Sequence, residues 1–210
     1  MTTPPDVVVV DLGLGNLRSV LRAIERAGGR PELSRDPDRV RRAPRLVTPG
    51  QGAFAECARA LDGGLGAAIT EAIDSGVPYL GICLGMQMLF ESSEEAPGER
   101  GLGTFAGRVA RLRDDLRDPD TGEALKVPHV GWNEVVSHHA LLPEREWFYF
   151  VHSYHCVPTD ETVVVGTASY GVSICAAVAR GNVLACQFHP EKSQDAGHRV
   201  LTRFVEARWS

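Results

Sequence analysis

The sequence lacks any long hydrophobic run. No segment approaches the ~20 consecutive apolar residues that a membrane-spanning helix needs. The first apolar stretch, Val7 to Val10, ends at Asp11, with no basic residues before it and no small-residue cleavage site after it. This pattern is not that of a signal peptide. We therefore expect a cytoplasmic protein without a membrane-spanning segment.

Cysteine is too sparse and too scattered for a disulfide framework or a zinc site. The cysteines are odd in number and form no C-x-x-C pair: Cys57, Cys83, Cys156, Cys175 and Cys186. The adjacent His138 and His139 have no cysteine or acidic partner at ligand spacing. We expect neither a metal nor another cofactor.

An excess of positive charge is also missing. The chain has 27 acidic and 22 basic residues and a formal net charge of −5, which opposes a primary role in binding nucleic acid. Hydrophobic residues make up 43% of the chain and charged residues 23%, the balance of an ordinary globular protein. This length and composition predict one domain over residues 1–210.

Short β-rich runs alternate with helical patterns in the first half of the chain. Val7 to Val10 is typical of a parallel strand that is covered on both faces. Asn16 is a good N-cap for the helical pattern that follows it. Further β-rich runs at 46–48 and 77–82 are separated by another helical stretch. The alternation predicts a parallel sheet with helices on its faces.

The pattern changes after about residue 100. β-rich runs at 162–168, 172–179 and 182–188 are separated by short turn sequences, which predicts antiparallel pairing. A helix is expected to close the chain over 194–208. The whole sequence therefore predicts an α/β fold with a central, mostly parallel sheet, helices on both faces and a C-terminal antiparallel portion.

The segment around Cys83 has the pattern of a nucleophile elbow. It runs from a strand through Gly81, Cys83 and Gly85 into a helical stretch, in the order G-x-C-x-G. Such a turn projects the side chain above the sheet, and the glycines remove Cβ atoms that would clash. A helix start beside the sulfur also favours the thiolate. A buried structural cysteine in a tight turn would show the same pattern.

A thiolate nucleophile needs a base and a group that orients the base. His189 and Glu191 provide both if the intervening backbone is extended, because alternate residues then share a side. Acyl transfer also needs donors for an oxyanion. The backbone N–H of Leu84 and the glycine-rich turn over 50–53 are candidates, although a turn of this kind also serves simple loop geometry.

Several segments together carry a family resemblance. The sequence GICLGMQ at 81–87 and the His189-Pro190-Glu191 segment resemble the class I, triad-type glutamine amidotransferases. Within that class, the chain most resembles the glutaminase subunits of imidazole glycerol phosphate synthase. Five segments carry this narrower resemblance: DLGLGNLRS at 11–19, PGQGAF at 49–54, PHVGWN at 128–133, FYFVHSY at 148–154 and FHPEKS at 188–193.

The resemblance implies roles for the matching residues. Cys83 would form a γ-glutamyl thioester, His189 would act as acid and base, and Glu191 would orient the histidine. The backbone oxyanion positions match Gly50, Gln51 and Leu84. The glutamine-binding positions match Gly52, Gln87, Glu95, Ser153 and Tyr154. Many family members carry valine where this chain has Gln51 and an aromatic residue where it has Leu12.

The resemblance also implies a partner. Glutamine would be hydrolysed to glutamate, and the ammonia would pass to a (β/α)8-barrel cyclase subunit in histidine biosynthesis. The two chains would form a heterodimer. The phosphorylated acceptor would bind the cyclase, so this chain is expected to lack a site for its phosphate. Asn16, Trp132 and Lys192 are expected to lie on the surface that faces the cyclase.

Three alternatives stay open at the level of sequence. The chain could be the glutaminase of a different synthase, although the segments at 11–19 and 128–133 weigh against that. It could be an independent cysteine hydrolase of γ-glutamyl compounds, which would turn over without a partner. It could also be a scaffold that has lost catalysis, but the presence of Cys83, His189 and Glu191 together opposes this interpretation.

Overall fold

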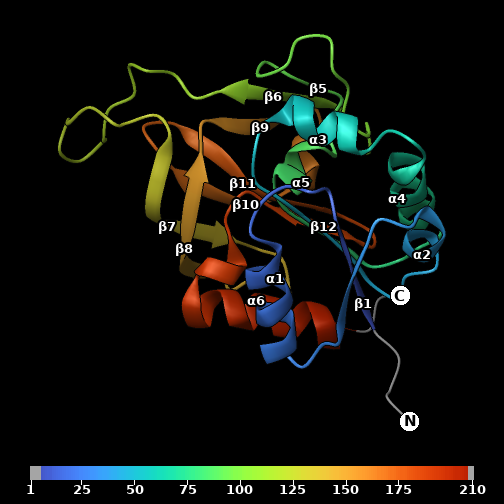
Figure 1. Ribbon diagram of the computed structural model, residues 1–210. Helices are drawn as coiled ribbons and strands as arrows, with labels where there is room; N and C mark the ends of the chain where they lie inside the picture. The colour runs from blue at the N-terminus through green and yellow to red at the C-terminus, as the bar shows by residue number, and fades with distance from the viewer. Residues whose placement is uncertain (1–5, 208–210) are drawn as a thin grey trace.

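The computed structural model describes residues 6–207, which form a large mixed sheet, a small second sheet and helices on both faces of the large sheet (Figure 1). The strands of the large sheet are β1 (Val7–Val10), β2 (Pro31–Ser34), β3 (Leu46–Gly50), β4 (Tyr79–Cys83), β7 (His129–Ser137), β8 (Arg145–His152), β10 (Val164–Ser169), β11 (Ser173–Arg180) and β12 (Val183–Cys186). The small sheet contains β5 (Ser92–Ser93), β6 (Gly107–Arg111) and β9 (Tyr154–Pro158).

The helices lie mostly in the first half of the chain. They are α1 (Leu17–Arg26), α2 (Pro37–Arg41), α3 (Phe54–Ala60), α4 (Leu65–Asp74), α5 (Leu84–Gln87) and the C-terminal α6 (Gln194–Glu206). Two short 3-10 turns, η1 (Glu161–Val163) and η2 (Pro190–Lys192), complete the described elements. No helix within residues 6–207 has the length and apolar character to cross a bilayer.

The large sheet has the order β2-β1-β3-β4-β12-β11-β10-β7-β8. Neighbouring strands from β2 to β12 pair in parallel, and the pairs from β12 to β8 are antiparallel. The predicted α/β fold with a parallel region and a later antiparallel portion is confirmed. The antiparallel portion extends further than predicted, because the hairpin of β7 and β8 joins it.

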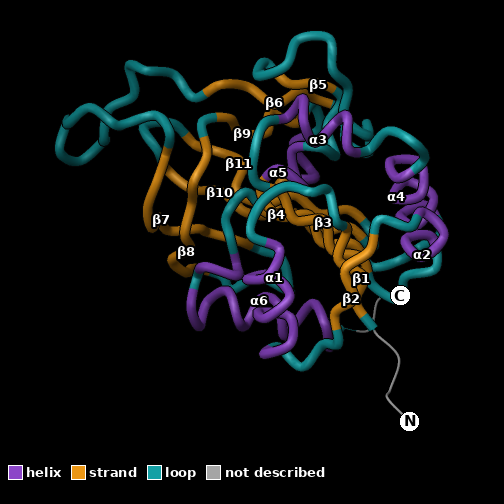
Figure 2. The backbone as a smooth tube through the Cα atoms, in the orientation of Figure 1, coloured by secondary structure: helices purple, strands orange, loops and turns teal. Residues whose placement is uncertain are grey.

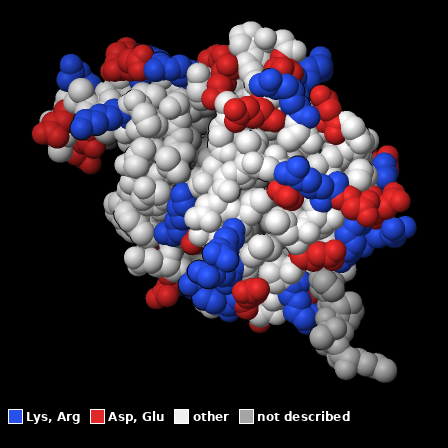
Figure 3. Space-filling view, in the orientation of Figure 1, with Lys and Arg blue, Asp and Glu red and all other residues white. Residues whose placement is uncertain are grey.

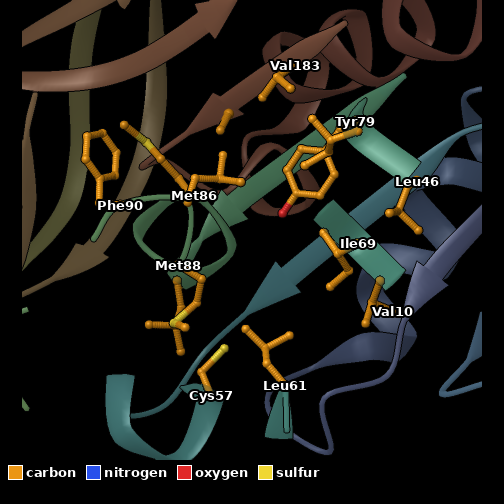
Figure 4. Close-up of a cluster of buried hydrophobic side chains, with 14 of the residues drawn as sticks. Val10, Leu46, Cys57, Leu61, Ile69, Tyr79, Met86, Met88, Phe90 and Val183 are labelled. Carbon is orange, nitrogen blue, oxygen red and sulfur yellow. The ribbon is translucent and has the colours of Figure 1, made fainter. Parts of the chain in front are cut away.

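The four valines of β1 pack into two different cores. Val7 and Val9 face the core under α1 and α6, whereas Val8 and Val10 face the core under α3, α4 and α5. Figure 2 shows these helices on opposite sides of the sheet, and Figure 4 shows Val10 among the side chains of the second core. A strand buried on both faces needs apolar residues at every position, which explains the unbroken valine run.

Helix α1 begins as the sequence predicts. The Asn16 side chain accepts a hydrogen bond from the Ser19 N–H at 3.3 Å and so caps the helix. Val20, Ala23 and Ile24 then face the core. Because α1 follows β1 directly, this cap also places Asn16 at the carboxyl end of the parallel strands, where sites of α/β folds collect.

Three parallel strands bring the candidate site together. In the register of the sheet, Gly50 of β3 lies opposite Cys83 of β4, and Ile82 lies opposite Cys186 of β12. The chain leaving β12 therefore passes beside Cys83 and reaches His189 a few residues later.

Basic and acidic side chains are interspersed over the face of the molecule shown in Figure 3.

The structure differs from the sequence-based expectation in its details. A strand was predicted over 162–168, but the first residues of this run belong to the 3-10 turn η1, and strand β10 starts at Val164. The helical stretch after Cys83 is a single turn, α5. The small sheet was not predicted, because β5 has two residues and pairs with a distant segment.

Candidate active site

Cys83 occupies a sharp turn between β4 and α5. Its φ of 52° lies in the left-handed region, which is rare for a residue with a side chain and marks local strain. The turn requires glycine nearby: a Cβ on Gly85 would lie 1.8 Å from the Thr48 carbonyl oxygen, and one on Gly81 would lie 2.8 Å from the Gly85 carbonyl oxygen. The predicted elbow geometry is confirmed.

The elbow also brings Leu84 next to Gly50. A Cβ on Gly50 would lie 2.5 Å from the Leu84 Cβ. Leu84 is the first residue of α5, so its N–H has no acceptor within the helix and can serve a bound anion. Because α5 is a single turn, however, its dipole stabilises a Cys83 thiolate less than the longer helix expected from the sequence would. Stabilisation of the thiolate therefore depends more on the polar groups around the sulfur.

His189 and Glu191 form a buried pair. His189 Nδ1 lies 2.8 Å from Glu191 Oε1, and the two side chains are 1% and 4% exposed. The expected contact is present, but its backbone is not extended: residues 190–192 form the 3-10 turn η2. Proline favours the first position of such a turn, and the turn folds the carboxylate back under the imidazole.

The other ring nitrogen of His189 is available for chemistry. Among the described atoms, His189 Nε2 has no hydrogen-bond partner. Burial lowers the pKa of His189, but the Cys83 sulfur and the Glu191 carboxylate outweigh burial and raise the pKa above its ordinary value. An imidazolium beside a thiolate is the form that can protonate a leaving nitrogen.

A pocket of about 440 Å³ opens beside Cys83. Besides Cys83, its lining includes these residues that the sequence analysis singled out: Gln51, Gly52, Leu84, Gln87, Glu95, Ser153, Tyr154 and Lys192. Pro128, Val151 and His152 complete the wall. The structure thus gathers the predicted glutamine-binding residues from distant segments around one sulfur atom.

Some pocket residues are held by the protein itself. Glu95 Oε2 accepts the Phe54 N–H at 2.9 Å, which fixes the carboxylate at the start of α3. Gln87 is 4% exposed and donates from Nε2 to the Tyr154 carbonyl oxygen at 2.9 Å. These contacts hold the side chains in place before a ligand binds, which lowers the entropy cost of binding.

A second, much smaller hollow shares Gln51 with the pocket. It has room for about one water molecule and is lined by Asn16, Gly50, Gln51, His189 and Glu191, among others. Gln51 Oε1 accepts the Asn16 N–H at 3.3 Å. The segment predicted to face the partner therefore touches the predicted oxyanion turn directly.

Trp132 lies outside the pocket on the outer face of the β7 and β8 hairpin. It is 43% exposed and packs edge-on against Tyr149, with ring centroids 6.0 Å apart. Lys192 Nζ lies 6.0 Å from the centroid of the same tyrosine ring. Trp132 and Lys192 thus belong to one surface, which reaches the pocket mouth through Lys192.

Gln187 was not predicted from the sequence as a site residue. This residue is fully buried, and its Nε2 lies 3.4 Å from Cys83 Sγ. The pairing of His129 with His152 was not predicted either; Nδ1 of His129 and Nε2 of His152 lie 3.2 Å apart. A polar residue inside the apolar run before His189 was the available signal for Gln187, whereas the histidine pair depends on strand register.

Comparison with known proteins agrees with this fold and site. The family model described as Glutamine amidotransferase class-I matches residues 8–207. A solved structure titled "Crystal structure of glutamine amidotransferase" superposes with a TM-score of 0.73 at 21% identity and covers 96% of this chain and 100% of that one. The structure of PurLQS from Thermotoga maritima also gives a TM-score of 0.73, at 18% identity, over 97% of this chain and 98% of that one. These similarities show the fold, and the chain belongs to the class I glutamine amidotransferases.

Curated relatives assign the chain to one family within this class. Imidazole glycerol phosphate synthase subunit HisH of Syntrophotalea carbinolica is 47% identical over 204 residues, with 94% of this chain and 98% of the relative covered. The protein of the same name from Dechloromonas aromatica is 49% identical over 207 residues, with 95% of each covered. Within its class, the chain is a member of the HisH family.

Proposed function

We propose that the chain is the glutaminase subunit of an imidazole glycerol phosphate synthase and that Cys83, His189 and Glu191 are its catalytic triad. The elbow of Cys83, beside the buried His189 and Glu191 pair, is the observation that carries the proposal. The relatives named HisH support the subunit assignment. The substrate is glutamine, and the product for the partner is ammonia.

Acylation begins with Cys83 as the thiolate and His189 as the imidazolium. The sulfur attacks the γ-carboxamide carbon of glutamine, and the carbonyl oxygen becomes an oxyanion next to the Leu84 N–H. When the carbon–nitrogen bond breaks, His189 Nε2 gives its proton to the leaving nitrogen. Ammonia is released, and a γ-glutamyl thioester remains on Cys83.

Hydrolysis returns the enzyme to its starting state. His189, now neutral, removes a proton from water, and the hydroxide attacks the thioester carbon. The carbon–sulfur bond breaks, glutamate leaves, and Cys83 is a thiolate again. Glu191 Oε1 holds Nδ1 of the histidine throughout, so that Nε2 faces the reacting atoms.

The second oxyanion donor comes from the turn after β3. We propose that the Gly50–Gln51 peptide N–H moves into place when the cyclase and its acceptor bind. The contact between Gln51 and Asn16 supports this, because it ties the turn to the segment that faces the partner. Loss of one oxyanion donor typically costs about 10²- to 10³-fold in rate, so the chain alone should turn over glutamine slowly.

The partner in this proposal is a (β/α)8-barrel cyclase that docks on the surface of Asn16, Trp132 and Lys192. Ammonia made at Cys83 reaches the cyclase through the docked face rather than through bulk water. The acceptor phosphate binds the cyclase. A cytoplasmic location for the reaction is part of the same proposal.

Glutamate release from glutamine tests the proposal. The purified chain is assayed alone, with a histidine-pathway cyclase, and with the cyclase plus its acceptor; Cys83→Ala is the control. The proposal predicts release that requires Cys83 and rises when both cyclase and acceptor are present. Release that requires Cys83 but ignores the cyclase would assign the chain to another synthase or to independent hydrolysis.

A further inference from the structure

Gln187 is placed beside the nucleophile by the sheet itself. Cys186 lies opposite Ile82 in the pairing of β12 with β4, so the next residue, Gln187, lies beside Cys83. Its side chain is fully buried, and Nε2 lies 3.4 Å from Cys83 Sγ. Burying an amide is costly unless it is hydrogen-bonded, and the Gln187 amide contacts both Gln87 and Cys83.

The direction of the Gln187 amide follows from its neighbours. The Tyr154 carbonyl oxygen can only accept, so the Gln87 atom 2.9 Å from it is the donor Nε2. The same Nε2 also lies 3.1 Å from Gln187 and must donate there, which assigns that Gln187 atom as Oε1. The remaining Gln187 atom, directed at Cys83, is therefore the N–H donor.

Two other buried cysteines, Cys175 and Cys186, have the opposite environment. Cys175 Sγ lies 3.8 Å from the Ala177 carbonyl oxygen, and Cys186 Sγ lies 3.4 Å from the Phe188 carbonyl oxygen. Beside an acceptor the sulfur must keep its proton and donate it, and burial raises the pKa of Cys175 to about 12. Cys83 faces a donor instead, and a donor favours the thiolate.

We propose that Gln187 is a further catalytic residue of this reaction: its amide N–H donates to the Cys83 thiolate, stabilises that form and fixes the position of the sulfur. Gln87 acts as a positioning residue, because its hydrogen bond to Gln187 Oε1 prevents the amide from turning its oxygen toward the sulfur. The inference rests on Cys83 being the nucleophile.

The remaining charges near the sulfur stay the same when Gln187 is changed. Apart from the pair of His189 and Glu191, the titratable groups around Cys83 are the buried thiols and the pocket residues Cys156, Cys186, Glu95, His152, Tyr154 and Lys192. A shift in the ionisation of Cys83 in a Gln187 variant therefore reports on the amide itself.

Alkylation of Cys83 by iodoacetamide across pH is the test. The isolated chain is used, and the modified Cys83 peptide is quantified by mass spectrometry. Gln187→Met keeps the shape but removes the donor, and it should move the pH midpoint of alkylation upward by about one pH unit. Gln187→Glu should move it further, because a carboxylate would face the thiolate. Gln87→Met should shift it in the same direction by less.

Asn182→Leu is the matched control. It removes a partly buried amide that donates to the Ile73 and Val77 carbonyl oxygens at the far end of β12. Its midpoint should equal that of the unchanged chain. Equal midpoints for Gln187→Met, Gln187→Glu and the control would overturn the role of Gln187. If Cys83 in the unchanged chain reacts no faster than Cys57, the nucleophile assignment itself fails.

Discussion

His189 and Glu191 are joined across a single 3-10 turn, with Nδ1 of the histidine 2.8 Å from Oε1 of the glutamate. The pair is almost fully buried, so water does not screen the interaction. The carboxylate both fixes the ring and favours its protonated form. The orientation of the His189 ring therefore depends on Glu191, and its protonation depends on Cys83 and Glu191 together.

Glu191→Gln should change the pH dependence of catalysis. Removing the carboxylate lowers the pKa of His189, so the imidazolium is lost at lower pH and the alkaline limb of kcat/KM shifts to lower pH. The rate at neutral pH should fall by about 10²-fold. The profile is measured with the cyclase present, and Glu161→Gln in η1 serves as the control. An alkaline limb that does not move would contradict the assigned role of Glu191.

Gly85→Ala should destabilise the fold. Its new Cβ would meet the Thr48 carbonyl oxygen at 1.8 Å, and backbone would have to move. We expect the free energy of unfolding to fall by about 3 kcal/mol or more. Gly76→Ala is the control: nothing lies within 4 Å, and only its positive φ of 85° opposes the change, at about 1–2 kcal/mol. Urea titration measures both, and equal losses would argue against close packing at the elbow.

The buried histidine pair should make the protein sensitive to acid. Burial lowers the pKa of His129 to about 4 and that of His152 to about 3. Between pH 6.5 and 4 the unfolded chain therefore binds protons that the folded chain does not, so stability falls as the pH falls. The slope is about 1.4 kcal/mol per pH unit for each histidine.

His129→Phe tests this acid dependence. The variant keeps an aromatic ring against Phe150 and Tyr170 but cannot bind a proton. The loss of stability between pH 6.5 and 4 should be shallower than in the unchanged chain. Val172→Ala, at an exposed position whose side chain binds no proton, should leave the slope as it was. Urea titrations at several pH values decide between a changed and an unchanged slope.

Trp132→Ala should weaken binding of the cyclase. An exposed aromatic residue beside a pocket mouth has the properties of an interface hot spot, and its loss typically costs about 2 kcal/mol, roughly 30-fold in Kd. Leu33→Ala is a control with similar exposure, 41%, on β2 at the opposite edge of the sheet. Calorimetric titration compares the variants, and equal affinities would place the partner elsewhere.

Much of the parallel half of the fold could be predicted from sequence. The valine run of β1 and the Asn16 cap carry local signals that the structure uses as expected. The elbow is also local, because two glycines and a cysteine in five residues specify the turn. In such segments local preference and tertiary packing agree.

Features that depend on distant pairings could not be predicted. β5 carries no pattern of its own and becomes a strand only through its pairing with β6. The role of Gln187 depends on the register of β12 against β4, which brings its amide to Cys83. The His189–Glu191 contact was predicted, but its 3-10 turn was not, because two different backbones can bring these side chains together.

Trapping the acyl-enzyme tests directly whether Cys83 is the nucleophile. The complex with the cyclase and its acceptor is quenched with acid during glutamine turnover, and cysteine peptides are analysed by mass spectrometry. If Cys83 is the nucleophile, a γ-glutamyl group is found on the peptide that contains Cys83, is absent from Cys83→Ala and is still present in Cys186→Ala. A Cys83→Ala variant that still releases glutamate from glutamine, or a glutamyl group found on a different cysteine, would contradict this assignment.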